Sequence, residues 1–296
     1  MIIFFSEIKS NVELDTYFQN RNDVFDKIKL QLEENTTDKG IRNSKLIALC
    51  QNNGYGKTAL LKMLPYFIPK LNYKGEDHNV FYPEIQLLQK VSILDNFIYI
   101  ILDGISELLF DSSIPQKIMN YSNFHLNSIK NNLHKFLTTS NNEVKKKAFK
   151  NLTFYYETNN ALEFKESPFQ KIIFRIDEIG EIDKTNDYLS KDEIQYVNIV
   201  NYHINMKFEF PFKFMRLYIL RNYINDFKSE AIDFVVAGKN SFQPYMGKMN
   251  FTNSPSEILF INLCPLNKDN HIKNICLYNF MITHSSKSKL KDILLD

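Results

Sequence analysis

Five short apolar runs give the first indication of how this chain folds. They are dense in Ile, Leu, Val, Phe and Tyr with little alternation, which is typical of strands buried on both faces of a parallel sheet. The pattern predicts strands at residues 45–50, 96–102, 171–176, 232–237 and 258–263. Because stretches with helical patterns separate the runs, we expect an α/β fold, a three-layer sandwich with a parallel central sheet.

Apolar positions three and four residues apart predict helices around these strands. One helix is expected over residues 16–35 and another over 58–67, and a helical insertion is expected near 106–163. A last helix is expected near the C-terminus. We therefore predict a core domain over residues 1–266 and a short helical lid or tail over 267–296.

The composition is that of a globular protein with balanced charge. Hydrophobic residues make up 44% of the 296 positions, which is enough for a sizeable core. Lys and Arg number 36 against 34 Asp and Glu, so whole-chain charge favours neither nucleic acid nor a membrane surface. Only the run Lys145, Lys146, Lys147 and Lys150 leaves nucleic-acid contact open, and in a predicted helix a solvated face is its default.

The three cysteines, Cys50, Cys264 and Cys276, are widely spaced and form no CxxC pair. This predicts neither a disulfide framework nor a zinc site and is typical of a reducing compartment. Cys50 ends an apolar run and is expected to be a buried core residue. The N-terminal apolar run is too short for a signal peptide or a membrane span, so we expect an intracellular protein, in cytoplasm or nucleus, with no membrane partner.

Candidate chemistry begins directly after the first predicted strand. Residues 51–58, QNNGYGKT, match the phosphate-loop pattern GxxxxGK[ST] except that Gln51 replaces the first glycine. Gly54 and Gly56 give the backbone freedom that inward-facing N–H groups require, and Lys57 is expected to reach the β- and γ-phosphates. The alternative is a polar turn with a solvated Lys57. The expected nucleotide contacts are Gln51, Asn52, Asn53, Gly54, Tyr55, Gly56, Lys57, Thr58 and Ala59.

Two later strand ends carry polar residues that would complete such a site. Asp177 and Glu178 end the run at 171–176, where Asp177 and Thr58 would hold Mg²⁺ and Glu178 would polarise the attacking water. Asp103, at the end of the run 96–102, is the second candidate for an acidic strand end. Asn240 follows the run at 232–237 and is expected to contact the γ-phosphate or the water, unless it only caps a turn.

These elements together resemble the AAA+ and STAND superfamily of P-loop ATPases. Residues 17–24, YFQNRNDV, look like the arginine-bearing segment that precedes the phosphate loop in STAND ATPases, and residues 258–270 resemble their last core strand and the turn into a lid. The order and spacing are similar to the ATPase domains of Crinkler effectors and retrotransposon hot spot proteins. The resemblance implies an ATPase that assembles or is fused to an effector domain, with an arginine that stabilises the charge of the transition state. Arg216 and Arg221 are the possible arginines, although structural salt bridges are the favoured role for both.

The functional expectation is an ATP-binding protein with Mg²⁺-dependent hydrolysis of the β–γ phosphoanhydride. The catalytic set is Lys57, Glu178 and Asn240, with ATP and Mg²⁺ as cofactors and a second copy or another protein as partner. GTP is disfavoured because the sequence has no NKxD pattern. The alternative is a nucleotide-binding interaction module or effector with little or no hydrolysis, which the altered loop start favours. A nucleic-acid-processing enzyme would need more clustered carboxylates than the sequence offers.

Overall fold

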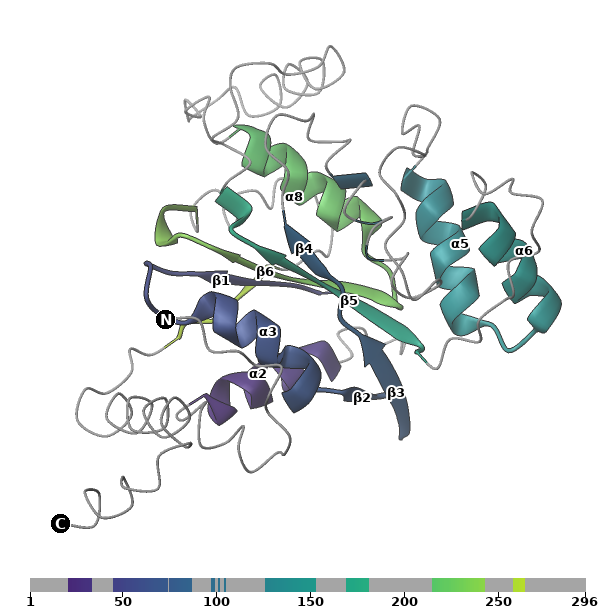
Figure 1. Cartoon of the computed structure of the whole chain (residues 1–296), viewed down its shortest axis with the longest axis horizontal. Coiled ribbons are helices and arrows are strands. Elements are labelled where there is room, and N and C mark those ends of the chain that lie inside the picture. Colours follow the sequence, from purple (N-terminus) through teal and green to yellow (C-terminus); the bar gives the residue numbers. More distant parts are fainter. Residues whose placement is uncertain are drawn as a thin grey trace, which may run out of the picture.

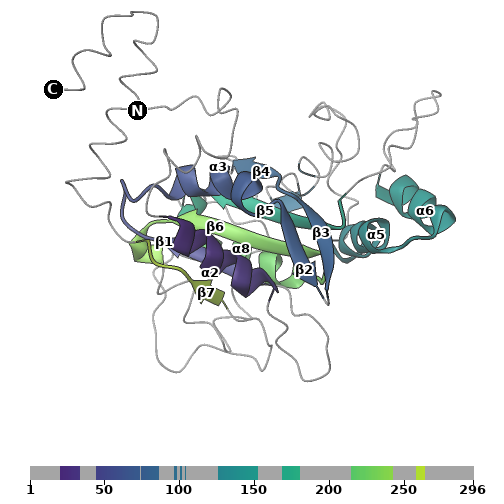
Figure 2. The same cartoon turned by 90° about the horizontal axis from the view of Figure 1, so that it is seen from below.

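A computed structural model describes residues 21–33, 45–73, 75–86, 97–98, 101, 104, 126–152, 169–180, 215–242 and 258–263. In this part the chain is a mixed α/β structure in which a mostly parallel sheet has helices on both faces (Figures 1 and 2). The predicted α/β class with a mostly parallel sheet is therefore confirmed.

The sheet has seven strands in the order β2-β3-β5-β6-β1-β7, and β4 also pairs with β5. All pairs are parallel except the β2–β3 hairpin. The strands are β1 (Leu46–Cys50), β2 (Lys70–Tyr73), β3 (Glu76–Phe81), β4 (Glu84–Gln86), β5 (Lys171–Asp177), β6 (Ile232–Gly238) and β7 (Ile258–Phe260). Four predicted strands are thus found, as β1, β5, β6 and β7, with the last one shorter than expected.

The predicted strand at residues 96–102 is wrong. Phe97, Ile98 and Ile101 have helical conformation and are buried, and Asp103 lies outside the described residues. A short run that is apolar on all sides does not distinguish a buried strand from a buried helical segment. Strands β2, β3 and β4 were not predicted because they are short and polar, as expected for strands near a sheet edge.

The helices are α2 (Asn22–Glu33), α3 (Lys57–Phe67), α5 (Leu126–Thr138), α6 (Asn142–Leu152) and α8 (Met215–Phe227), with a 3₁₀ turn, η6 (Asn240–Phe242). The first two confirm the helices predicted around residues 16–35 and 58–67, as far as these are described. Helices α5 and α6 lie within the stretch 106–163, where the sequence predicted helices. The predicted C-terminal helix lies outside the described residues.

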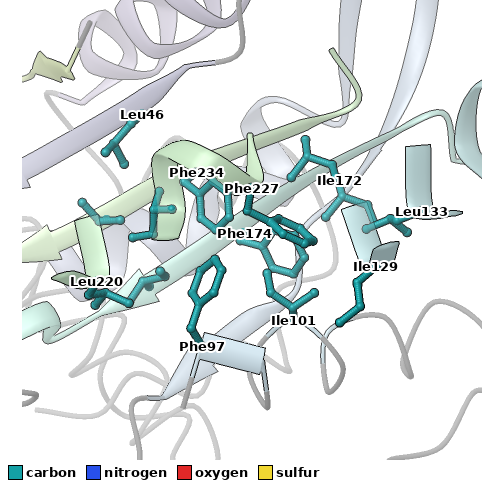
Figure 3. Close-up of a cluster of buried hydrophobic side chains, with 14 of the residues drawn as sticks. Leu46, Phe97, Ile101, Ile129, Leu133, Ile172, Phe174, Leu220, Phe227 and Phe234 are labelled. Atoms are coloured by element: carbon teal, nitrogen blue, oxygen red, sulfur yellow. The ribbon is translucent and has the colours of Figure 1, made fainter. Parts of the chain in front are cut away.

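Both faces of the central strands are buried, and alternate residues serve opposite faces. In β1, Leu46, Ala48 and Cys50 join a cluster with α8 and α5, whereas Ile47 and Leu49 join a cluster with α2 and α3. Figure 3 shows the first cluster, in which the Phe174 and Phe234 rings stack with centroids 5.2 Å apart. Each such buried side chain contributes roughly 1.5–3 kcal/mol. Because the faces are filled, polar chemistry is left to the ends of the strands.

Arg175 of β5 ties the sheet to α3 at a point where the helix lacks a hydrogen bond. Pro65 has no N–H, so the carbonyl of Leu61 cannot accept the bond that residue 65 would normally donate. Nη1 of Arg175 donates to Leu61 O at 2.9 Å, and its Nη2 donates to Tyr82 O at 2.7 Å. This buried guanidinium therefore fixes α3 relative to the strand that ends in Asp177.

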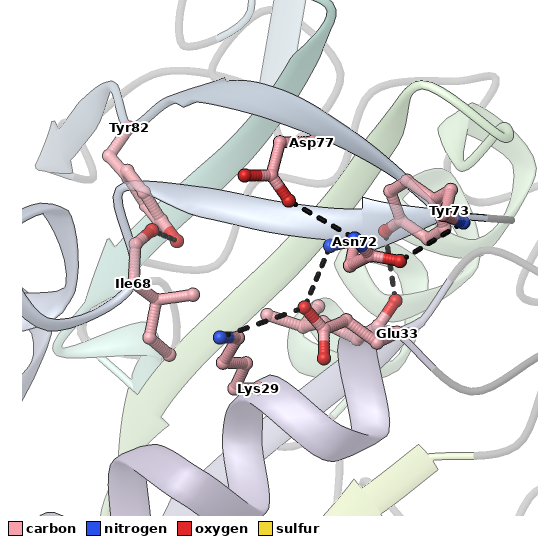
Figure 4. Close-up of polar contacts among 9 residues, drawn as sticks. Lys29, Glu33, Ile68, Asn72, Tyr73, Asp77 and Tyr82 are labelled. Carbon is pink, nitrogen blue, oxygen red and sulfur yellow. Dashed lines mark hydrogen bonds and ion pairs between the residues drawn. The ribbon is translucent and has the colours of Figure 1, made fainter.

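The β2–β3 hairpin holds the C-terminal end of α2 (Figure 4). The N–H of Asn72 donates to Glu33 Oε1 at 2.7 Å, and the Tyr73 hydroxyl donates to Leu32 O at 2.9 Å. Both acceptors belong to the last turn of α2. At the other end, the ring of Phe25 stacks on Phe67 of α3 with centroids 4.2 Å apart. Helix α2 is thereby held against both the hairpin and α3. This fixes the position of Arg21, which directly precedes the helix.

The side chains of two buried lysines, Lys171 and Lys228, differ in their partners near Asp233 of β6. Lys171 Nζ lies 2.6 Å from Asp233 Oδ2, and the backbone N–H of Lys45 donates to Asp233 Oδ1 at 2.7 Å. Lys228 is only 7% exposed, and its Nζ has no hydrogen-bond partner in the described part of the chain. Burial lowers the pKa of Lys228 to about 8, an effect that Asp233 partly offsets and Arg221 increases. Lys228 is thus a buried cation without direct compensation.

We expect Lys228→Met to stabilise the protein by up to about 3 kcal/mol at pH 7, because it removes a charge that burial disfavours. The pKa of Lys228 is lower in the folded state, so the unfolded chain binds more protons. Wild-type stability should therefore rise with pH from about 8 towards the normal lysine range, and the advantage of Lys228→Met should vanish there. Urea unfolding at several pH values measures this. The matched variant Lys171→Met should instead destabilise the protein, since it removes the buried ion-pair partner of Asp233 and leaves only neutral donors to this carboxylate. Equal effects of both variants would contradict the assignment.

Candidate functional site

The predicted polar elements meet at one edge of the sheet because three parallel strands lie side by side. Strand β6 lies between β1 and β5, with Cys50 opposite Gly238 and Val236 opposite Ile176. The chain leaves these strands at their carboxyl ends into residues 51–58, the acidic pair at 177–178, and η6. Polar residues that are widely separated in sequence therefore share the edge where open α/β sheets bind ligands.

The loop between β1 and α3 depends on two glycines for its backbone path. Gly54 and Gly56 have φ of 86° and 80°, in the left-handed region that other residues rarely adopt. No heavy atom lies within 4 Å of a Cβ built at either position, so conformation and not space requires glycine here. Gly56 is the N-cap of α3 and has no side chain to bond the first N–H groups of the helix. Those groups remain directed at the loop, which suits an anion.

Lys57 closes the loop from inside. Its side chain is only 8% exposed, and Nζ donates to the carbonyls of Gln51 and Asn52, each at 2.9 Å. An ammonium group has three donors, so one remains for a further acceptor. The Lys57 side chain is therefore not solvated, contrary to the alternative expectation of a polar turn with a solvated lysine. Asn52, Asn53 and Thr58 are exposed, whereas Ala59 is partly buried.

Arg21 holds the loop from the outside. It is 4% exposed, and its Nη2 donates to Tyr55 O at 3.0 Å. In a trans peptide the C=O and the following N–H point in opposite directions. The bond to Arg21 therefore directs the N–H of Gly56 away from Arg21. The sequence placed Arg21 in an arginine-bearing segment by resemblance but gave it no contact, and only the fold identifies Tyr55 as its partner.

Gln51 does not crowd the loop, although it occupies the position of a glycine. Its backbone N–H donates to Gly238 O at 3.1 Å, which continues the pairing of β1 with β6. Its side-chain amide is directed at the backbone of Leu263, which it contacts through both Oε1 and Nε2. Leu263 is a contact that no sequence pattern indicated.

The acidic pair lies at a bend that ends β5. Asp177 is partly buried and is the last strand residue, whereas Glu178 is exposed and has φ of 49°. The Glu178 N–H donates to Asp177 Oδ1 at 2.9 Å, so Oδ2 of Asp177 is not used in that bond. A non-glycine residue in this region costs on the order of 1 kcal/mol, and such strain is frequent at functional sites.

Phe242 of η6 locks the ends of β5 and β6 together. A Cβ at Gly180 would overlap the Phe242 ring, and a Cβ at Gly238 would press on Ile179. This close packing fixes the start of η6, where Asn240 is exposed and Lys239 is partly exposed. The distance from Asn240 to the loop is set by the β1–β6 pairing and not by local sequence.

The other candidate residues are placed as follows. Arg221 is 2% exposed in α8, which agrees with a structural role, and Arg216 is the second residue of the same helix. Cys50 is buried, and burial raises the pKa of its thiol to about 12 although Lys57 lowers it, so it is a core residue as predicted.

The donors at this edge suit a hard cation that is held mainly by phosphate. The described residues contain no group of three or more His, Cys, Asp or Glu side chains arranged to hold a metal. Thr58 in the first turn of α3 and Asp177 offer one hydroxyl and one carboxylate. Mg²⁺ typically binds through one or two protein ligands together with phosphates and water.

No protein-family model, curated protein or solved structure matches this chain. The resemblance to AAA+ and STAND ATPases therefore stays a prediction. None of the helices in the described ranges has the length and apolar character needed to cross a bilayer.

Proposed function

We propose that this protein is a P-loop ATPase of the AAA+ or STAND type, a three-layer sandwich that binds ATP with Mg²⁺ and hydrolyses it. The observation that carries the proposal is the loop of residues 51–56, closed by Lys57 at the start of α3 on the same sheet edge as Asp177 and Glu178.

Phosphate recognition follows from the start of α3. The first N–H groups of a helix lack intrahelical partners and carry partial positive charge. Gly56 offers no capping side chain, and the first turn contains no acidic residue that would repel an anion. Lys57 adds a full charge with one donor to spare. This set of donors favours a di- or triphosphate over an uncharged ligand.

Hydrolysis would use the ends of β5 and β6. Asp177 and Thr58 would hold Mg²⁺, which supplies charge neutralisation of the phosphates when it is bound. Glu178 is exposed beyond the strand end and would orient and deprotonate the attacking water. Asn240 would donate a hydrogen bond to the γ-phosphate or orient the same water.

A second candidate function is a nucleotide-binding interaction module with little hydrolysis. It is favoured by the burial of Arg221, since a charge donor for the transition state must reach the phosphates. In that case a second copy of the chain or another protein would bind selectively to the nucleotide-bound form.

Glu178→Gln is expected to retain ATP binding and to lose at least about a hundredfold in phosphate release, since a general base contributes roughly 10²–10⁴-fold. Binding is measured with a fluorescent ATP analogue and hydrolysis by phosphate release, each with Mg²⁺. Glu76→Gln is the matched control, because Glu76 is an exposed carboxylate at the start of β3, away from the carboxyl ends of the parallel strands.

The two candidate functions give different results in the wild type. Binding with hydrolysis that Glu178→Gln abolishes supports the ATPase. Binding without hydrolysis supports the interaction module, and failure of the wild type to bind any nucleotide contradicts both.

A further inference from the structure

Gln51 makes a pair of hydrogen bonds that glycine, the usual residue at its position, cannot make. Its Nε2 donates to Leu263 O at 2.8 Å, and its Oε1 accepts from Leu263 N–H at 2.7 Å. The two residues are 212 positions apart in the chain. A side-chain amide thus satisfies both polar groups of a single backbone residue.

This pair extends the β1–β7 ladder beyond the end of both strands. Backbone pairing runs from Leu46 opposite Ile258 to Ala48 opposite Phe260, and the Ile261 N–H still donates to Ala48 O at 3.1 Å. Two residues later, the Gln51 side chain takes the place of a backbone partner for Leu263. The Leu263 side chain is buried and Gln51 is partly buried, so the pair lies at the border of the core and is partly shielded from water.

The same residue is also bonded to the interior of the loop. Gln51 O accepts from Lys57 Nζ, and Gln51 N–H donates to Gly238 O. The phosphate-loop lysine, β6 and the chain after β7 therefore meet at one residue. If the bond between Lys57 Nζ and the Gln51 carbonyl changes, the backbone of Gln51 shifts, and so does the side chain that bonds Leu263.

We propose that Gln51 is a positioning residue that couples the occupancy of the phosphate loop to the order of the backbone at Leu263. The inference rests on the proposed nucleotide binding. It adds a route by which bound nucleotide changes the order of the backbone that follows β7. A ligand that fixes Lys57 stabilises the Gln51 pair, and by linkage the intact pair strengthens binding of that ligand.

The proposal makes a prediction against the sequence pattern. Gln51→Gly restores the usual glycine, yet it is expected to weaken Mg–ATP binding about tenfold, within the usual range of coupling between sites. Gln51→Glu keeps an acceptor for the Leu263 N–H but places a carboxylate oxygen against Leu263 O, so it should give an intermediate loss. Ser140→Gly is the control for a glycine introduced into an exposed connection, because Ser140 lies between α5 and α6 and belongs neither to the loop of residues 51–58 nor to the Leu263 pair.

Hydrogen exchange at the Leu263 amide, measured with and without Mg–ATP, reports the bond directly. The expected result is slow exchange in the wild type, further slowing with Mg–ATP, and fast nucleotide-independent exchange in Gln51→Gly. Binding in the wild type with unchanged exchange at Leu263, or Gln51→Gly binding as tightly as Ser140→Gly, overturns the coupling alone. Absence of nucleotide binding in the wild type overturns the proposed function and the coupling together. In that case, the difference in Leu263 exchange between the wild type and Gln51→Gly still tests whether the hydrogen-bonded pair forms.

Discussion

Lys57→Ala is expected to lower the affinity for Mg–ATP by at least about a hundredfold, because hydrogen bonds to charged groups contribute about 1.5–3 kcal/mol each. The lysine would supply a charge to the phosphates, and it also bonds the carbonyls of Gln51 and Asn52. Its removal therefore deletes a ligand contact and releases the start of the loop. Isothermal titration with Mg–ATP measures the loss.

The matched control for this variant is Lys62→Ala. Lys62 is an exposed lysine of the same helix, five residues beyond Lys57, so its removal changes the charge of α3 without touching the loop. Binding close to that of the wild type is expected. If Lys57→Ala binds Mg–ATP as well as Lys62→Ala does, and its circular dichroism spectrum is unchanged, the loop is not a phosphate site.

Arg175→Met is expected to destabilise the fold by about 3 kcal/mol, because it leaves two buried carbonyls without donors at about 1–3 kcal/mol each. These carbonyls belong to Leu61 and Tyr82, at 2.9 and 2.7 Å from the guanidinium. Methionine keeps much of the aliphatic volume, so packing loss is small. Urea denaturation followed by circular dichroism measures the change.

Pro65→Ala provides the internal control for this assignment. Alanine restores an N–H at the position that can donate to Leu61 O within α3, so it replaces one of the two bonds that Arg175 makes. Pro65→Ala should therefore stabilise the Arg175→Met background more than the wild type. Additive effects in this double-mutant cycle would show that Arg175 does not serve the proline-interrupted turn.

Local pattern was sufficient for the elements that carry their signal in consecutive residues. Strands buried on both faces appear as continuous apolar runs, so β1, β5 and β6 were predicted closely. The loop between β1 and α3 was predicted because the fixed spacing of glycine, lysine and threonine is typical of a glycine-containing turn that leads from a strand into a helix. The same reasoning failed at Phe97, Ile98 and Ile101, which are helical and buried, because buried helical residues have the same apolar composition as a buried strand.

The sequence by itself determined which residues form the loop, that the strand at residues 171–176 leads into Asp177 and Glu178, and that the sheet is mostly parallel. Only the tertiary structure decided that β6 lies between β1 and β5. It also supplied Arg21 as partner of Tyr55, Leu263 as partner of Gln51 and Arg175 as partner of Leu61. These pairs are 34, 212 and 114 residues apart, and contacts at such separations leave no periodic signal in the chain because they depend on how the strands are ordered in space.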